Sequence, residues 1–141
     1  QNSRVGTVAI MDTIITRTLG NATDFGDLLS DTASNVGGGA CNATRGILAG
    51  GYLHNIIQYI TMATTGNSAD FGDLLTNQNN LRAASSKTRG IFAGGSTPSN
   101  SNVIESVQIT TTGNSVNFGD MAYVGGDVGQ ITFNSNAHGG I

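Results

Sequence analysis

The sequence predicts an all-β protein made of three repeats, each about 47 residues long and folded as four short antiparallel strands. Three observations predict this class. The same short sequences recur at a nearly constant spacing. The stretches between them are rich in Ile, Val and Thr and are interrupted by Gly and Asn. No window keeps the three- and four-residue apolar spacing that an amphipathic helix requires.

The clearest marker of the repeat is a nine-residue sequence that occurs three times. It reads GNATDFGDL from Gly20, GNSADFGDL from Gly66 and GNSVNFGDM from Gly113, so successive copies lie 46 and 47 residues apart. A second marker reads TRGILAGG from Thr44 and TRGIFAGG from Thr88. Because both markers recur with nearly the same period, the whole chain, 1–141, is expected to form a single repeat domain.

The markers also set the expected bounds of each unit. The three units are expected at about 3–43, 44–87 and 88–136, with 137–141 as the start of a further unit. In the third unit the four strands are expected at 89–95, 103–111, 116–122 and 128–134. A four-stranded unit of this length cannot bury both of its faces alone, so each unit is expected to stack on its neighbours.

Each nine-residue marker begins with a Gly-Asn pair, at 20–21, 66–67 and 113–114. Gly and Asn both tolerate positive φ angles, which the tightest hairpin turns require. The pairs therefore predict tight turns between two neighbouring strands of each unit.

The composition excludes several functional classes. Six Lys and Arg residues are too few to follow the phosphates of a nucleic acid, and the net charge is −3. No apolar run approaches the eighteen or so residues of a membrane-spanning helix, so no membrane insertion is expected. The single cysteine, Cys41, excludes an internal disulfide and a cysteine-built zinc site. It is expected to be a small, buried strand residue.

Two features of the repeats resemble the kelch family of β-propellers. The pairs Gly50-Gly51 and Gly94-Gly95 each close an apolar strand, as the kelch double glycine does, and Arg82 precedes the second of these strands. The combination of GN-x-x-DFGDL with TRG-x-x-AGG is similar to kelch-type repeats in tail or fibre proteins of bacteriophages and algal viruses. The resemblance implies that each unit is a four-stranded propeller blade.

The resemblance also assigns a role to three phenylalanines. Phe25, Phe71 and Phe118 stand where kelch repeats usually carry a Trp, and they are expected to occupy equivalent buried positions between blades. In two copies this Phe lies in the tripeptide DFG, which also occurs at the metal site of protein kinases. The other kinase motifs do not occur in the chain, so the repeated tripeptide predicts a structural role.

The repeated carboxylates are expected to serve turns. Asp27, Asp73 and Asp120 end the repeated Gly-Asp step and are expected to accept backbone N–H groups, as in Asx-turns. Calcium bound by Asp24 with Asp27, or by Asp70 with Asp73, is an alternative, but calcium takes six to eight oxygens and usually more carboxylates per loop. No metal or cofactor is therefore expected.

Three further polar residues occupy equivalent positions in the repeats, namely Asp12, Gln58 and Glu105. They share a strand face with Ile14, Ile60 and Val107 and are expected to approach either the region between units or a central channel. Since one of the three is an amide, buried structural hydrogen bonding is expected rather than acid–base catalysis. Tyr52 and His54, in contrast, do not repeat and lie in the loop after Gly50-Gly51, where aromatic side chains with a polar tip often mark a contact surface.

The predicted function is that of a non-catalytic structural or receptor-binding module, on a virion surface or otherwise outside the cell. The alternative is a glycan-binding propeller lectin or a glycan-active enzyme module. Closed propellers have about four to eight blades, so three units are not expected to close alone. The expected partners are therefore further copies of the chain or neighbouring repeats of a longer one, together with a glycan or protein of a host surface.

Overall fold

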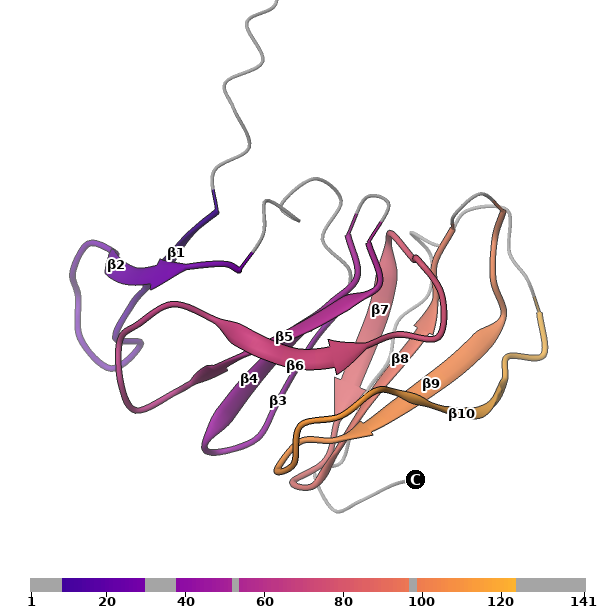
Figure 1. Cartoon of the computed structure of the whole chain (residues 1–141). Coiled ribbons are helices and arrows are strands. Elements are labelled where there is room, and N and C mark those ends of the chain that lie inside the picture. The colour runs from indigo at the N-terminus through magenta and orange to yellow at the C-terminus, as the bar shows by residue number, and fades with distance from the viewer. Residues whose placement is uncertain (1–8, 30–37, 52–53, 97–98, 124–141) are drawn as a thin grey trace, which may run out of the picture.

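The computed structural model describes residues 9–29, 38–51, 54–96 and 99–123. In these residues the chain forms ten β-strands and no helix, so the all-β prediction is confirmed. The strands form three antiparallel sheets that follow one another along the chain (Figure 1). Within the same residues no helix has the length and apolar character needed to cross a membrane.

Sheet I is a two-stranded hairpin, and sheets II and III each contain four strands in sequence order. Sheet I consists of β1 (Ile10–Thr13) and β2 (Thr23–Asp27). Sheet II consists of β3 (Gly39–Cys41), β4 (Arg45–Ala49), β5 (Ile56–Thr61) and β6 (Ala69–Asp73). Sheet III consists of β7 (Leu81–Ser85), β8 (Arg89–Gly94), β9 (Val103–Gln108) and β10 (Val116–Asp120).

The sheets begin one strand earlier than the expected units. The unit expected at 44–87 would place the strand 81–85 beside β6, whereas β7 pairs with β8. The reason is local, because only residues 86–88 separate these two strands. The Ser86 hydroxyl accepts the Thr88 and Arg89 N–H groups and closes that turn. The strand expected at 128–134 and the further unit at 137–141 lie outside the described residues.

The three sheets repeat one irregularity in the pairing of their last two strands. In each, the register shifts by one residue, which leaves Phe25, Phe71 and Phe118 without a partner across the hairpin. This is a β-bulge, which bends a strand and changes the direction of its side chains. The glycine after each Phe has a φ angle of +145°, +147° and +151° in chain order.

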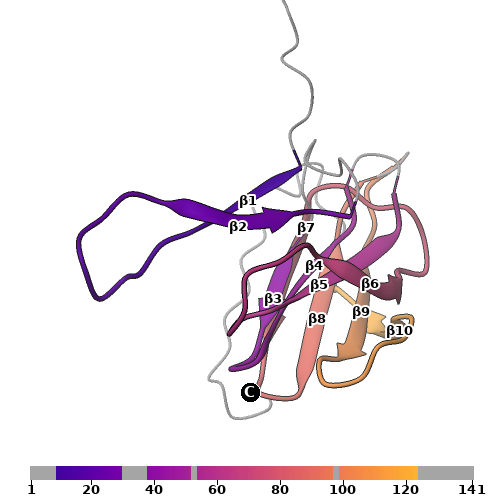
Figure 2. The same ribbon diagram turned by 60° about the vertical axis from the view of Figure 1, so that its left-hand side comes forward.

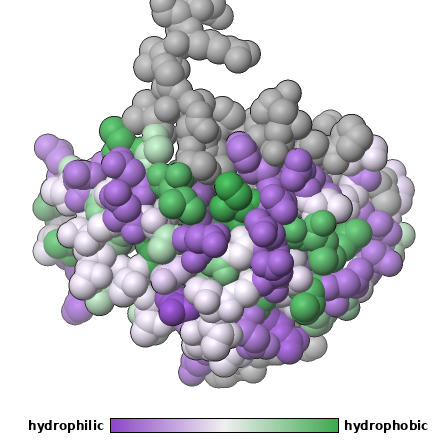
Figure 3. All heavy atoms as spheres, in the orientation of Figure 1, coloured by the Kyte–Doolittle hydropathy of each residue, from purple (hydrophilic) through white to green (hydrophobic). Residues whose placement is uncertain are grey.

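Sheet II lies between the other two sheets, with sheet I on one side and sheet III on the other (Figures 1 and 2). Most of the core lies between sheets II and III and is shared by both. Its members are Ala40, Ile47, Ala49, Ile57, Phe71, Leu74, Leu81, Phe92, Val107 and Ile109. On the face shown in Figure 3, apolar residues gather in separate patches among polar ones.

Strands β3 and β7 also meet across sheets II and III, and this contact corrects the prediction for Cys41. The Cys41 N–H donates to the Ser85 hydroxyl over 3.1 Å, and the Asn42 amide donates to the Lys87 carbonyl over 3.2 Å. Cys41 itself is exposed rather than buried. Side chains alternate along a strand, and in β3 it is Ala40 that turns towards the core.

Candidate functional site

The most elaborate arrangement of polar groups in the described residues lies where one sheet meets the next. At junction I–II, the segment 66–68 runs along the edge of β2. The Gly66 N–H donates to the Phe25 carbonyl over 2.7 Å, and the Ser68 N–H donates to the Asp27 carbonyl over 2.8 Å. In return, the Asp27 N–H donates to the Asn67 side-chain oxygen over 3.0 Å. The pattern is that of a parallel ladder in which a side-chain amide replaces one backbone carbonyl.

Junction II–III repeats this arrangement with the corresponding residues of the next sheet. The Gly113 N–H donates to the Phe71 carbonyl over 2.7 Å, and the Ser115 N–H donates to the Asp73 carbonyl over 2.8 Å. The Asp73 N–H donates to the Asn114 side-chain oxygen over 3.1 Å. The two junctions are therefore built by the same atoms at nearly the same distances.

The prediction that the Gly-Asn pairs form hairpin turns is therefore wrong. Between β5 and β6 the chain turns at 62–64, before Gly66, and between β9 and β10 it turns at 109–111, before Gly113. The φ angles of these two glycines, +155° and +157°, belong to nearly extended backbone. Such backbone suits a segment that pairs along a strand rather than one that reverses direction.

A buried side chain completes junction I–II. The side chain of Gln58 on β5 is only 2% exposed, and its oxygen accepts the Ser68 hydroxyl over 2.6 Å and the Leu29 N–H over 2.9 Å. The Ser68 hydroxyl also accepts the Leu29 N–H over 2.7 Å. Gln58 therefore fixes the chain as it leaves sheet I, which is the structural role that its repeat position predicts.

Glu105 does the same at junction II–III. It is 3% exposed, and one carboxylate oxygen accepts both the Ser115 hydroxyl and the Leu75 N–H, the latter over 3.0 Å. Asp12, at the matching position of sheet I, is instead exposed. Sheet I has no earlier sheet beside it among the described residues, so nothing there buries Asp12.

The repeated glycine of β2 and β6 is required because the backbone of the following Gly-Asn segment passes very close to it. A Cβ atom on Gly26 would lie 2.4 Å from the Gly66 oxygen, and one on Gly72 would lie 2.5 Å from the Gly113 oxygen. Both distances are far shorter than a real Cβ contact. Gly119 of β10 has the same backbone angle, but nothing described lies within 4 Å of its Cβ position.

The three phenylalanines are not equally buried, so that prediction is wrong for two of them. Phe71 is 2% exposed and packs edge-on against Tyr59, with 6.0 Å between the ring centres. Phe25 is half-buried and Phe118 is 52% exposed. Phe71 faces sheet III, whereas no further sheet covers Phe118 among the described residues. Phe25 belongs to sheet I, which has only two strands in the described residues.

The double glycines surround the connection between sheets II and III. Gly50, Gly51, Gly94 and Gly95 have φ angles of +76°, +138°, +75° and +95°. A Cβ on Gly50 would lie 2.4 Å from the Gln78 carbonyl oxygen, and one on Gly95 would lie 2.6 Å from the Gln78 side-chain oxygen. The Gly51 N–H donates to the backbone carbonyl of Gln78 over 3.0 Å. These glycines therefore give the connecting chain its space.

The Asx-turn expected at the repeated Asp is also displaced. At the bulge of β2 the accepting carboxylate belongs to Asp24, which takes the Gly26 N–H over 3.1 Å. Asp27 and Asp73 instead enter the junctions through their backbone groups, and Asp120 ends β10 with none of the junction contacts of those two. No three His, Cys, Asp or Glu side chains are grouped as metal ligands in the described part of the chain.

Of the two predicted surface-contact residues, Tyr52 lies outside the described residues. His54 is half-buried, and its contacts are made by the backbone. Its N–H donates to the Gly51 carbonyl over 3.2 Å, and its carbonyl accepts the Gln78 N–H over 3.3 Å. The imidazole is thus not placed in any cluster of polar side chains described here.

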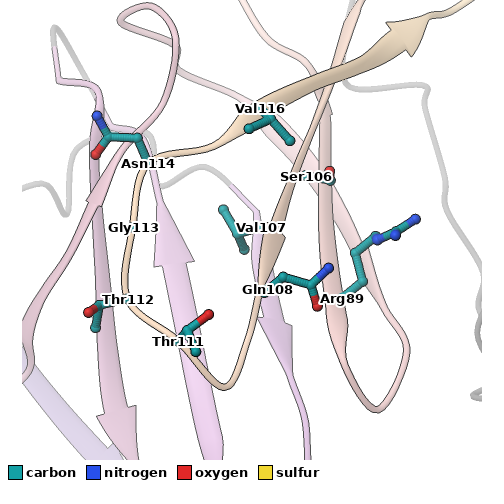
Figure 4. Close-up of a pocket in the computed structure, with 9 residues that line it drawn as sticks. All are labelled: Arg89, Ser106, Val107, Gln108, Thr111, Thr112, Gly113, Asn114 and Val116. Atoms are coloured by element: carbon teal, nitrogen blue, oxygen red, sulfur yellow. The ribbon is translucent and has the colours of Figure 1, made fainter.

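A pocket of about 230 Å³ opens on sheet III and was not predicted from the sequence. Figure 4 shows Arg89, Ser106 and Gln108 on one side of it and the segment from Thr111 to Val116 on the other. Its volume is below the range of about 300–1,000 Å³ that is usual for ligand pockets.

Comparison with protein-family models finds no family that matches the chain, and comparison with curated proteins finds no similar protein.

The side-chain amide in the junction has a testable effect. Asn114→Ala removes the acceptor of the Asp73 N–H and is expected to lower the free energy of unfolding by about 1 kcal/mol. Asn21→Ala, at the same repeat position of sheet I, is expected to change it by less than about 0.5 kcal/mol. Urea unfolding of both variants in dilute solution measures the difference, and equal effects would contradict the junction.

Proposed function

We propose that the chain is a non-catalytic structural module of an extracellular adhesin or fibre, of the kind carried on virion surfaces, and that its sheets are kelch-like propeller blades. The observation that carries this proposal is the repetition of one junction. Junctions I–II and II–III use equivalent backbone groups and an Asn side chain at the same repeat position. Each also has a buried polar side chain at one repeat position, which is Gln58 in the first junction and Glu105 in the second. A chain with this design joins units in series.

The arrangement of sheets II and III supports the assignment to blades. Each has four antiparallel strands in sequence order, and their first strands, β3 and β7, lie side by side. Radial repetition of four-stranded sheets is the architecture of β-propellers. The double glycines support the same assignment, because they occupy the crowded connection between the two sheets.

The hydrogen bonds made by the buried polar residues support a non-catalytic role. Gln58 and Glu105 are the most deeply buried of the candidate acid–base positions, and both hold backbone N–H groups of the preceding sheet. Catalysis by a carboxylate needs a group free to exchange a proton with a substrate. Glu105 is occupied by two junction contacts instead.

A glycan-binding role is the second candidate, and the pocket on sheet III favours it. Arg89, Gln108 and Thr111 provide a guanidinium, an amide and a hydroxyl group, which can bind the hydroxyls of a sugar. One sugar unit at most would fit the volume of this pocket.

A glycan array combined with a hydrolysis assay on the same sugars tests both candidates. We expect no turnover of any sugar, whether or not one binds. Binding that Gln108→Ala abolishes would assign the pocket to a glycan. Turnover that is lost in His54→Ala or Glu105→Gln, with each variant still folded by circular dichroism, would contradict the non-catalytic proposal.

A further inference from the structure

We propose that the outer face of sheet III binds the β1–β2 hairpin of a second copy of this chain, so that copies join head to tail through the same junction that joins their sheets. This inference rests on the proposed structural role and names the partner of the module. It follows from comparing the two ends of the stack with junctions I–II and II–III.

The outer face of sheet III repeats most of the residues that sheet II turns towards sheet III, although Ser106 stands at the position of Tyr59. Glu105 points towards sheet II, so its neighbours Ile104 and Ser106 point to the opposite, outer face. Three apolar positions that are buried in sheet II are more exposed here, whereas Ala93 and Ser106 of this face are 0% and 6% exposed. Ile47, Ile57 and Phe71 are 1%, 0% and 2% exposed, whereas the matching Ile91 and Ile104 are half-buried and Phe118 is 52% exposed.

The edge of β10 has space for a second chain. At β6, the place beside Gly72 is filled by Gly113 and Asn114 of the following sheet, whose atoms lie 2.5–2.8 Å from a Cβ built on Gly72. At Gly119 no described atom lies within 4 Å of that position, although the backbone has the same φ angle. A Gly-Asn segment therefore fits at β10 as it does at β6.

An arginine beside this edge also lacks the contact that its counterpart makes. The Arg45 guanidinium of sheet II reaches across the junction and donates to the Ile109 carbonyl over 3.1 Å. The matching Arg89 lies over the Phe118 ring, 5.6 Å from its centre, and borders the pocket of sheet III (Figure 4). In the head-to-tail pair, Arg89 is expected to reach the Thr16 carbonyl of the second copy, since Thr16 occupies the position of Ile109 in sheet I.

Sheet I carries the complementary features. Its Gly20-Asn21 pair matches Gly66-Asn67 and Gly113-Asn114, which bind β2 and β6 in the two junctions. In the head-to-tail pair, the Asn21 side chain is expected to accept the Asp120 N–H of the other copy. The exposed carboxylate of Asp12 is expected to accept the Ala122 N–H, as Gln58 accepts that of Leu29.

Sheets I and III lie on opposite sides of sheet II, so these features belong to different surfaces (Figures 1 and 2). An interface between two different surfaces of identical chains is heterologous, and it produces either a closed ring or an open filament. Each chain contributes two independent surfaces to an interface of this type. A variant that lacks one surface can therefore still pair with a variant that lacks the other.

Sedimentation velocity of the 141-residue protein over a range of concentrations tests the inference. Wild type is expected to grow from one chain to larger species as concentration rises. Asn21→Glu places a second negative charge beside Asp120 of the other copy, and Phe118→Glu places a charge in the apolar face. Each is expected to weaken association at least about tenfold. Asn77→Glu, an exposed position on the connection between sheets II and III, is the control and is expected to associate like wild type.

Mixing the two variants gives the decisive result. Asn21→Glu retains a functional sheet III face, and Phe118→Glu retains a functional hairpin, so an equimolar mixture is expected to form a species of two chains that grows no further. Circular dichroism checks that each variant is folded. A wild type that stays a single chain, or a mixture that fails to pair, would overturn the inference. A single-chain wild type without catalytic turnover would leave the proposed structural function intact, whereas an associating protein with turnover would overturn that function alone.

Discussion

Phe71→Ala is expected to lower the free energy of unfolding by about 3–5 kcal/mol, the usual cost of removing a large aromatic side chain from a core. Phe71 is 2% exposed, and it contacts Tyr59 inside the cluster shared by sheets II and III. Its removal therefore leaves a cavity between two sheets rather than within one. Urea unfolding followed by circular dichroism measures the loss.

Phe118→Ala is the matched control, because Phe118 occupies the same repeat position at the end of the stack. It is 52% exposed, so in dilute solution the change is expected to stay within about 0.5–1 kcal/mol. Similar losses for the two variants would mean that the two positions are buried alike, which the described packing contradicts.

Gly72→Ala is expected to destabilise the protein by about 3 kcal/mol more than Gly119→Ala. The two glycines have φ angles of +147° and +151°, so the backbone strain caused by a side chain is nearly the same. The variants differ in their surroundings. The new methyl group at Gly72 would collide with the backbone of Gly113 at 2.5 Å, whereas the one at Gly119 meets no described atom within 4 Å.

The difference in unfolding free energy between the two glycine variants therefore measures the effect of the close approach at the junction, separately from the backbone strain at the bulge. Thermal or urea unfolding of both proteins in dilute solution measures it. If both variants lost the same stability, the glycine would be needed only for its backbone angle, and the close approach of sheets II and III at Gly72 would be wrong.

The repeat spacing was sufficient to predict the fold class and the role of one pair of polar residues. Alternation along a strand and the equivalence of Gln58 with Glu105 placed both side chains between units, where each is buried and hydrogen-bonded. These predictions succeeded because Gln58 and Glu105 meet equivalent surroundings at the two junctions.

Other predictions failed where the surroundings differ between copies or where pairing depends on the whole chain. Phe118 has the sequence context of Phe71 but belongs to the last of the described sheets, so the sequence pattern alone cannot show that it is 52% exposed. The Gly-Asn pairs were assigned to turns from their backbone preferences, and nothing local reveals that Asn67 reaches a strand 40 residues earlier in the chain. The burial of Cys41 depends on which face of its strand the side chain lies on, and that strand is only three residues long.

The central claim is that equivalent junctions join the sheets in series, and amide hydrogen exchange tests it most directly. The Asp73 and Ser115 N–H groups, which lie in junction II–III, are expected to be protected almost as well as the amides of β8 and β9. The Asp120 N–H, at the same repeat position as that of Asp73, is expected to exchange orders of magnitude faster in dilute solution. Equal exchange at Asp73 and Asp120 in dilute protein would contradict the junction and, with it, the assembly of the chain from serially joined sheets.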